Sequence, residues 1–510
     1  MPHREQYTMS SEGGGAAGLY AALLLQRENH RVHVFEGTNR VGGRIYTHHF
    51  STQANQYFEA GAMRIPDSKF HTITFQLINY LNSFPRIGNH DDRKHQLARN
   101  TPWLGVGFLE KLQGPDFEEA FWQEIVQKFD NFTFRQYLLD VMAWPVDVID
   151  FVETVTGQTG QFALSVTEMV MHSMDFRTEK WETINHGMSR LPDAMAFLLG
   201  HQNITYGARV TGIVEVEGGQ VELRTCGRQA KVNVKFDKVI LAIPPAALRM
   251  LVDRPRWDVP KELAIRSMSF EPFYKMGLRF KTRFWEQLEN EDRPSMGGQS
   301  TTDLPIRWIV FPSNGIETDG PGVLIVYAWM KDATTWLPLT PFERQRVALH
   351  CLAEVYAFTT ARLPTDVTWA TSSATGTAMF SPGQFQQRFK PARQREGNVY
   401  FAGEHLSHHH MWISGALDSA LCTVRDMLEK PELEPLCPEV KPLLIGAVDL
   451  EESAPEVDFE IISNDPVYEV SSIKVELGLT DTDAKRLPTR LGAVDPFMFC
   501  GTVVALGGMN

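Results

Sequence analysis

Residues 13–18 read Gly-Gly-Gly-Ala-Ala-Gly, which places Gly13, Gly15 and Gly18 at the spacing G-x-G-x-x-G. Glycines at these places allow a tight turn, a close approach of the backbone to a pyrophosphate, and close packing of the next helix on a sheet. We predict that helix over residues 19–27, with free N–H groups and the positive end of its dipole available to phosphates. The same spacing also occurs in flexible turns, so the residues behind it decide between the two interpretations.

Acidic and basic side chains follow the predicted helix. A predicted strand over residues 31–35 is followed by Glu36, whose carboxylate can accept both ribose hydroxyls of an adenosine. Arg40 and Arg44 then bracket two glycines, and paired guanidinium groups suit a second phosphate contact. A charged surface turn is the alternative for Arg40 to Arg44. The strand and the acid favour a dinucleotide-binding unit.

The segment in front of the glycine turn departs from this pattern. The first strand of such a unit is central in a parallel sheet and is normally a buried apolar run. Residues 7–12 instead read Tyr-Thr-Met-Ser-Ser-Glu, with Glu12 where an apolar residue is expected. Either the native start of the protein lies upstream, or this copy has a compromised cofactor domain.

Size, composition and charge narrow the class of protein. The chain has 510 residues, 43% of them hydrophobic and 22% charged, which is ordinary for a globular protein. Its net charge of −13 argues against nucleic acid as a partner, because phosphate binding needs clustered Lys and Arg. Five scattered cysteines without a C-x-x-C pair predict neither a zinc site nor a disulfide framework. We expect a cytoplasmic protein, because neither a signal peptide nor an apolar run of about 18 residues occurs.

Four motifs together resemble the flavin-containing amine oxidase superfamily. They are the glycine turn, residues 40–44, Gly-Ala-Met-Arg at 61–64, and Tyr-Phe-Ala-Gly-Glu-His at 400–405. Within that superfamily the chain is similar to the L-amino-acid oxidases of fungi and snake venoms, and residues 407–417 are most similar to the fungal group. The resemblance covers about residues 13–430.

The resemblance implies a mixed α/β (α+β) fold. An FAD-binding Rossmann-like domain is assembled from discontinuous segments, beside a substrate-binding mixed-sheet domain and a helical insert. The expected order is FAD-binding at 1–74, helical insert at 75–184, FAD-binding at 185–260, substrate-binding at 261–375, FAD-binding at 376–430, and an acidic tail of unknown role at 431–510.

The resemblance implies FAD as the cofactor, held by residues from both ends of the chain. The backbone of Val210 is expected at the adenine, Gly403 and Glu404 at the pyrophosphate and ribityl chain, and Ile413 at the pyrimidine edge of the flavin. A helix from Ser414 would point its positive end at that edge. The full expected set is Gly13, Gly15, Gly18, Glu36, Arg40, Arg44, Met63, Arg64, Val210, Gly403, Glu404 and Ile413.

Four catalytic residues are also implied by the resemblance. Arg64 and Tyr327 are expected to bind the α-carboxylate of the substrate, and Trp412 to form a wall beside its Cα. Lys275 is expected to hydrogen-bond flavin N5 through a water molecule and to assist the reaction with oxygen. Two alternatives stay open: Arg64 as a core arginine paired with Glu59, and Tyr327 as an ordinary strand aromatic.

Three consecutive histidines, His408, His409 and His410, do not predict a metal site, because consecutive residues cannot converge on one ion in regular structure. We expect His410 to face the active site, and His408 or His409 to face the surface.

Aromatic residues at helical spacing predict a helical core, part of which can line the entry for the substrate. They are Phe121, Trp122, Phe132, Phe134, Tyr137, Trp144 and Phe151. This stripe favours bulky apolar or aromatic substrates.

The reaction implied by the resemblance is FAD-dependent oxidative deamination of an L-amino acid, with O2, to the 2-oxo acid, ammonia and hydrogen peroxide. Neither nucleic acid nor a membrane is an expected partner. An amine or polyamine oxidase, an amino-acid 2-monooxygenase and a non-catalytic flavoprotein fold stay open, and so does the oligomeric state, a homodimer included.

Overall fold

The computed structural model describes residues 8–84, 95–98, 119–176, 178, 180–227, 232–286, 295–356 and 367–438. Helices and sheets alternate along these ranges, so the predicted mixed class is confirmed.

A five-stranded sheet joins segments that lie far apart in the sequence. β1 (Thr8–Glu12) is its central strand and pairs in parallel with β2 (Arg31–Phe35) and β12 (Lys238–Leu241). β8 (Ile204–Thr205) continues the sheet beyond β2, and β18 (Val399–Phe401) continues it beyond β12, both in parallel. The sheet is therefore complete only when the first, middle and last parts of the described chain come together.

Residues 8–12 form the strand that their composition argues against. Parallel pairing on both sides supplies the backbone of β1 with hydrogen bonds, and these bonds do not require apolar side chains. The expected lack of a convincing first strand is therefore wrong for the backbone.

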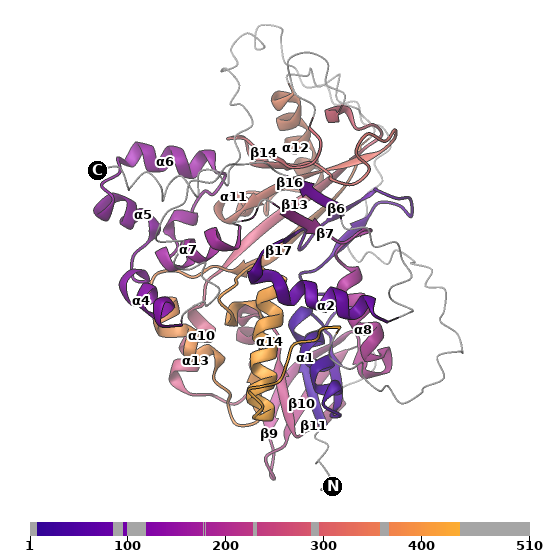
Figure 1. Ribbon diagram of the computed structural model, residues 1–510, viewed down its shortest axis with the longest axis vertical. Helices are drawn as coiled ribbons and strands as arrows, with labels where there is room; N and C mark the ends of the chain where they lie inside the picture. The colour runs from indigo at the N-terminus through magenta and orange to yellow at the C-terminus, as the bar shows by residue number, and fades with distance from the viewer. Residues whose placement is uncertain are drawn as a thin grey trace.

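Two helices that begin at the predicted cofactor motifs lie side by side (Figure 1). α1 (Ala16–Arg27) begins at Ala16 rather than at Leu19, and it is buried from Ala16 to Leu25. α14 (Ile413–Leu428) follows the motif around residue 403 and packs on α1. α2 (Thr72–Asn82) and α8 (Arg190–Leu199) pack against this pair of helices.

A second five-stranded sheet lies above these helices in Figure 1. It is antiparallel, in the order β14 (Gln299–Thr301), β15 (Trp308–Val310), β16 (Gly322–Trp329), β13 (Phe270–Phe280) and β17 (Thr368–Ala378). Every residue of β16 is buried, and Tyr327 on β16 lies opposite Lys275 on β13. The register thus brings two predicted catalytic residues together.

A helical segment lies beside this sheet, at the left of Figure 1. It contains α4 (Glu119–Phe129), α5 (Phe134–Gln136), the π-helix η2 (Tyr137–Val141), α6 (Val146–Val155) and α7 (Val166–Asp175). Two further strands, which the sequence analysis does not predict, precede and follow this segment in the chain. They are β6 (His95–Ala98) and β7 (Lys180–Thr183), and they form a small sheet with β5 (Ile65–Pro66).

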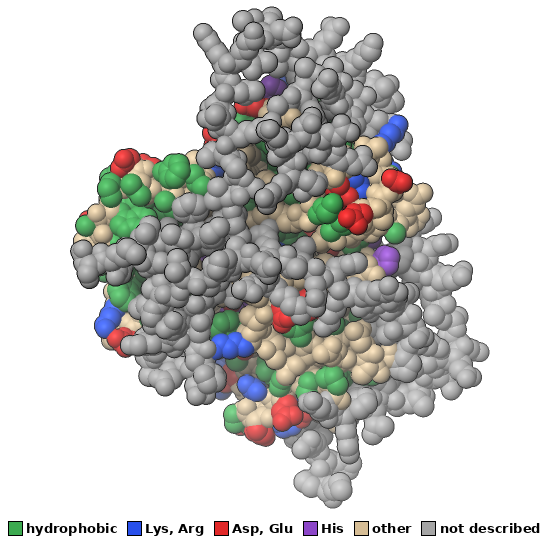
Figure 2. Space-filling view, turned by 45° about the horizontal axis from the view of Figure 1, so that its top comes forward, with side chains coloured by type: hydrophobic (Ala, Val, Ile, Leu, Met, Phe, Trp, Pro, Cys, Tyr) green, Lys and Arg blue, Asp and Glu red, His purple; other side chains and the backbone are tan. Residues whose placement is uncertain are grey.

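The aromatic stripe is only partly a core. Trp122 and Phe134 are buried, whereas Phe132 is 38% and Phe151 is 56% exposed. Figure 2 shows hydrophobic side chains gathered on the surface at the left, over this helical segment. None of the described helices combines the length and the apolar composition needed to span a lipid bilayer.

The remaining elements include an antiparallel sheet of three strands and a two-stranded sheet. They are β3 (Thr47–His49), β4 (Tyr57–Glu59), η1 (Lys69–His71), η3 (Gln161–Ala163), η4 (His201–Asn203), β9 (Ala208–Glu215), β10 (Val221–Gly227), β11 (Val232–Phe236), α9 (Pro245–Met250), α10 (Val259–Ser267), η5 (Phe284–Glu286), α11 (Met330–Thr334), α12 (Pro341–Val355), η6 (Phe385–Phe389), α13 (Lys390–Arg393) and η7 (Glu404–Leu406). The antiparallel sheet has the order β11, β10 and β9, and β3 and β4 form the two-stranded sheet.

Candidate active site

In the glycine turn between β1 and α1, Gly13 has no room for a side chain, whereas a Cβ at Gly15 would meet no atom within 4 Å. Gly13 has a φ of +100°, and a Cβ there would lie 2.7 Å from the carbonyl oxygen of Ala242. Gly15 is the N-cap of α1, where no side chain caps the helix and no acidic residue stands in its first turn. Gly18 lies inside the helix and is buried. Neither the N-cap residue nor the first turn of α1 therefore supplies a side-chain acceptor to the backbone N–H groups at the start of the helix.

Glu36 lies at this turn, as predicted. One carboxylate oxygen accepts a hydrogen bond from the backbone N–H of Gly14 at 2.8 Å. The other accepts from the backbone N–H and the hydroxyl of Thr38, at 2.8 and 2.7 Å. The acid is therefore fixed at the first strand-to-helix turn.

Arg40 and Arg44 have different surroundings. The guanidinium of Arg40 donates to the carbonyls of Val41 and Gly43 and lies 4.3 Å from the centre of the Tyr46 ring, so it stabilises its own turn. Arg44 instead reaches across the chain to Glu404, with 2.6 Å between Nη1 and Oε1.

Glu404 is a buried carboxylate that stays ionised. Burial raises its pKa, but Arg44 and the nearby histidines more than reverse this and lower the pKa to about 2. Gly403, just before it, has no room for a side chain, because a Cβ there would lie 2.6 Å from the His405 ring. The pair Arg44–Glu404 therefore joins the two predicted cofactor motifs.

The other predicted cofactor residues occupy separate places. Val210 is buried on β9, and Ile413 is the buried first residue of α14. Met63 and Arg64 are half-buried in the segment after β4.

Lys275 and Tyr327 face each other in the interior. The Lys275 Nζ donates to the carbonyls of Glu59 and Gly61, at 3.1 and 2.5 Å, and lies 4.7 Å from the centre of the Tyr327 ring. Burial lowers the pKa of Lys275 to about 7 and raises the pKa of Glu59 to about 7. Burial also raises the pKa of Tyr327, which keeps its hydroxyl protonated.

Arg64 lies in aromatic surroundings. Its guanidinium carbon is 4.5 Å from the centre of the Trp181 ring and 5.6 Å from that of Phe176. Its Nη1 donates to the side-chain oxygen of Gln299 at 3.3 Å. The carboxylate of Glu59, the alternative partner, accepts instead from the Thr47 hydroxyl and the N–H of Met188.

Trp412 shares these aromatic neighbours. Its ring centre lies 5.1 Å from that of Phe176 and 6.1 Å from that of Trp181. On the other side, Tyr327 lies 5.5 Å from Trp329. Arg64, Tyr327 and Trp412, which are far apart in the sequence, thus border one aromatic cluster.

His172 belongs to this cluster and was not predicted. Its ring centre lies 4.6 Å from Phe176 and 5.8 Å from Trp329. Burial, together with the charge of Arg64, lowers the pKa of His172 to about 3, so the imidazole is neutral. No motif in the sequence marks His172. Its spacing from Glu168 and Asp175 would place the three residues on one face of a helix, and this is the one signal that the sequence gives.

His408 and His409 are both half-buried, and His408 lines the pocket described below. His409 bonds to Asp175 at 2.8 Å and its side chain is only 18% exposed, while the His408 ring packs 4.7 Å from Trp122. His410 is buried and bonds to Glu168 at 2.8 Å. Carboxylates on α7, remote in sequence, draw this segment inward. Within the described ranges, no group of three or more His, Cys, Asp or Glu side chains is arranged to hold a metal ion.

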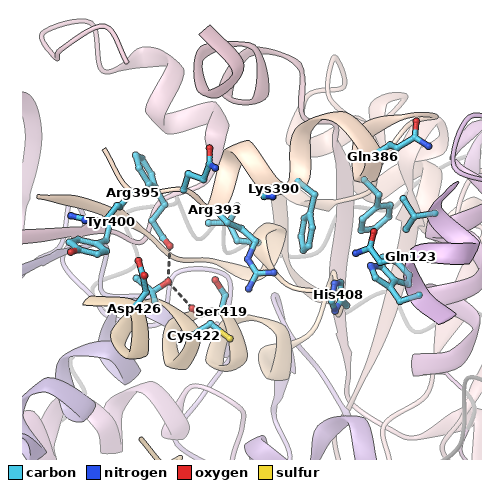
Figure 3. Close-up of a pocket in the computed structure, with 18 of the residues that line it drawn as sticks. Gln123, Gln386, Lys390, Arg393, Arg395, Tyr400, His408, Ser419, Cys422 and Asp426 are labelled. Atoms are coloured by element: carbon cyan, nitrogen blue, oxygen red, sulfur yellow. Dashed lines mark hydrogen bonds between the residues drawn. The ribbon is translucent and has the colours of Figure 1, made fainter. Parts of the chain in front are cut away.

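A separate pocket of about 1130 Å³ lies on another side of α14, between α4, α13 and β18. Figure 3 shows Arg393 and Lys390 on one wall and Ser419, Cys422 and Asp426 of α14 on the other. None of the predicted site residues lines it.

Comparison with known proteins places the chain among flavoenzymes. Residues 16–428 match the family model described as flavin containing amine oxidoreductase. A putative bifunctional amine oxidase of Dictyostelium discoideum is 29% identical, over 99% of this chain and 54% of its own length, so the chain spans about half of that relative. A putative L-amino-acid oxidase of Bacillus subtilis is 28% identical, over 80% of this chain and 92% of its own length. L-amino-acid oxidase 4 of Hebeloma cylindrosporum is 29% identical, over 82% and 81%.

Solved structures share the fold. A putrescine oxidase double mutant has a TM-score of 0.64 at 17% identity, over 83% of this chain and 99% of its own. The cyclohexylamine oxidase of Brevibacterium oxydans has a TM-score of 0.60 at 16% identity, over 84% and 99%. The predicted Rossmann-like FAD-binding fold with a substrate-binding domain is thereby confirmed.

Proposed function

The chain belongs to the flavin-containing amine oxidoreductase family, and from this premise we propose that it oxidatively deaminates an L-amino acid with a bulky apolar or aromatic side chain. FAD is the cofactor of the family, and O2 is the second substrate in the proposed reaction. The products are the 2-oxo acid, ammonia and hydrogen peroxide.

The residues of the glycine turn fit FAD. A turn without room at Gly13, an α1 N-terminus without a side-chain cap, and Glu36 beside them suit an ADP half. We assign the segments 1–74, 185–260 and 376–430 to the FAD-binding domain, because β1 and β2, β8 and β12, and β18 complete one parallel sheet. The segment 75–184 is then the helical insert and 261–375 the substrate-binding domain.

The surroundings of Arg64 are the observation that most supports an amino acid as the substrate. A guanidinium among aromatic rings, close to Tyr327 and Trp412, suits an anionic group on an otherwise apolar substrate. A carboxylate can accept two parallel hydrogen bonds from this group, and the protonated Tyr327 hydroxyl can donate another. Simple amines lack that carboxylate.

The proposed roles divide between binding and chemistry. Arg64 and Tyr327 fix the carboxylate, and the aromatic faces of Trp412, Phe176 and Trp181 take up the side chain and exclude water. When bound, FAD would supply the redox chemistry, as acceptor of a hydride from Cα and as donor of two electrons to O2. Burial lowers the pKa of Lys275 to about 7, so its amine can gain or lose a proton near neutral pH. We place this amine beside the reacting atoms.

Replacement of Arg64 tests this assignment. Arg64→Ala should raise the KM for L-phenylalanine about 100-fold, because a charge-assisted bidentate contact worth about 3 kcal/mol is lost. Any turnover of 2-phenylethylamine should stay within about twofold, because that amine makes no such contact. Arg224→Ala, at an exposed arginine on β10, is the matched control and should leave both unchanged.

Two results would contradict the proposal. An unchanged KM for L-phenylalanine in Arg64→Ala would favour an amine or polyamine oxidase. An amide in place of the 2-oxo acid would identify a monooxygenase.

A further inference from the structure

One face of α7 meets three consecutive residues in front of Trp412. Glu168, His172 and Asp175 follow each other at helical spacing and so lie on one side of the helix. Each of them contacts one residue of the segment 409–411. The pairs are Asp175 with His409, Glu168 with His410, and His172 with Met411.

The two carboxylate pairs are short; the His410 pair is fully buried, and the His409 side chain is 18% exposed. His409 Nδ1 lies 2.8 Å from Asp175 Oδ1, and His410 Nδ1 lies 2.8 Å from Glu168 Oε2. Burial lowers the pKa of each imidazole, but the facing carboxylate more than reverses this, so both pKa values are raised. A charge-assisted pair in a buried place resists separation, because each partner alone would be left without compensation. We call these two pairs the clamp.

The segment held by the clamp has an unfavourable backbone. Met411 has a φ of +75°, in the left-handed region that side chains other than glycine rarely adopt. Its N–H donates to Glu404, and its sulfur lies 3.1 Å from the Nδ1 of His172. Trp412 follows directly and is the N-cap of α14. Contacts on both sides therefore maintain a conformation that the chain would otherwise leave.

We propose that Glu168 and Asp175 are positioning residues, which hold Trp412 against Phe176 and Trp181 through the clamp. This inference rests on the proposed function in one point, namely that Trp412 contacts the substrate. It assigns the helical insert a share in substrate orientation, because α7 lies in the insert while Trp412 belongs to the C-terminal FAD-binding segment.

Isosteric variants test the clamp. Glu168→Gln and Asp175→Asn should slow flavin reduction by saturating L-phenylalanine about tenfold or more, since small misplacements of an orienting group are costly. In a Trp412→Phe background the same changes should have less than about a twofold effect, because they act through Trp412. Glu286→Gln is the matched control, since it removes a carboxylate from the buried Arg283–Glu286 pair on another part of the chain.

A second readout does not need activity. The difference between the near-ultraviolet circular dichroism of wild type and of Trp412→Phe isolates the signal of Trp412 in its aromatic cluster. Glu168→Gln and Asp175→Asn should lose that signal, and Glu286→Gln should keep it. If one clamp variant does not fold, as judged by its melting curve, the other carries the same comparison.

The outcomes separate the two proposals. Loss of the Trp412 signal together with non-additive rates supports the clamp. A retained signal, or slowing that is equal in the wild-type and Trp412→Phe backgrounds, overturns it. If no L-amino acid reduces the wild-type holoenzyme, the proposed function fails, and the dichroism signal alone decides the clamp.

Discussion

Lys275 shows how burial changes the chemistry of a single residue. Its folded pKa is about 7, against 10.5 for the ordinary side chain, so between these values the unfolded chain binds a proton that the folded protein lacks. The free energy of unfolding therefore rises with pH across this window, by at most about 1.4 kcal/mol per pH unit. Below pH 7 the contribution is constant.

Lys275→Met removes this contribution while keeping an unbranched side chain of similar length. The difference in free energy of unfolding between wild type and variant should change steadily from pH 7 to pH 10. Urea denaturation at four pH values measures it. A difference that is the same at every pH would mean that Lys275 is charged in the folded protein throughout.

Residue chemistry explains which site residues the sequence predicted. Arg64, Lys275, Tyr327 and Trp412 were named from motifs, and the structure brings them to one cluster. Glu168 and Asp175 were not named, because a carboxylate on an amphipathic helix has no distinguishing neighbour in sequence. Their partners follow more than 200 residues later, at separations of 242 and 234.

α7 is the element on which the clamp depends, and Ser165 begins it. The Ser165 hydroxyl accepts a hydrogen bond from the backbone N–H of Glu168 at 3.0 Å, which caps the first turn. Ser165→Ala should lower the free energy of unfolding by about 1 kcal/mol. Ser173→Ala is the control in the same helix, because its hydroxyl donates only to the carbonyl of Met169 and its loss should change stability by less than about 0.5 kcal/mol. Equal effects of the two substitutions would show that the cap does not stabilise α7.

Elements with local signals were predicted well, and those that depend on remote pairing were not. β2 has its predicted ends, and α1 begins only slightly early, because glycine spacing and apolar periodicity are local properties. The polar composition of β1 argues against a strand, yet β2 and β12 pair with it on both sides. β6 and β7 were missed, because their pairing with β5 joins residues across the insert.

At the scale of the whole molecule, the first, middle and last parts of the described chain meet in one parallel sheet, where we propose the cofactor site. The ion pair Arg44–Glu404 spans 360 residues and connects the first of the proposed FAD-binding segments to the last. The parallel sheet adds the middle segment through β8 and β12. The sequence predicts this assembly because the glycine turn and the motif around Glu404 both match FAD-binding motifs. It does not predict how α7 holds the residues before Trp412.

Anaerobic reduction of the bound flavin shows directly whether the protein oxidises an L-amino acid. Purified holoprotein would be mixed without oxygen with L-phenylalanine, D-phenylalanine or 2-phenylethylamine, while flavin absorbance near roughly 450 nm is followed. We expect L-phenylalanine to bleach the flavin, and the D-enantiomer and the amine to leave it oxidised. Bleaching by the amine but not by L-phenylalanine would contradict it.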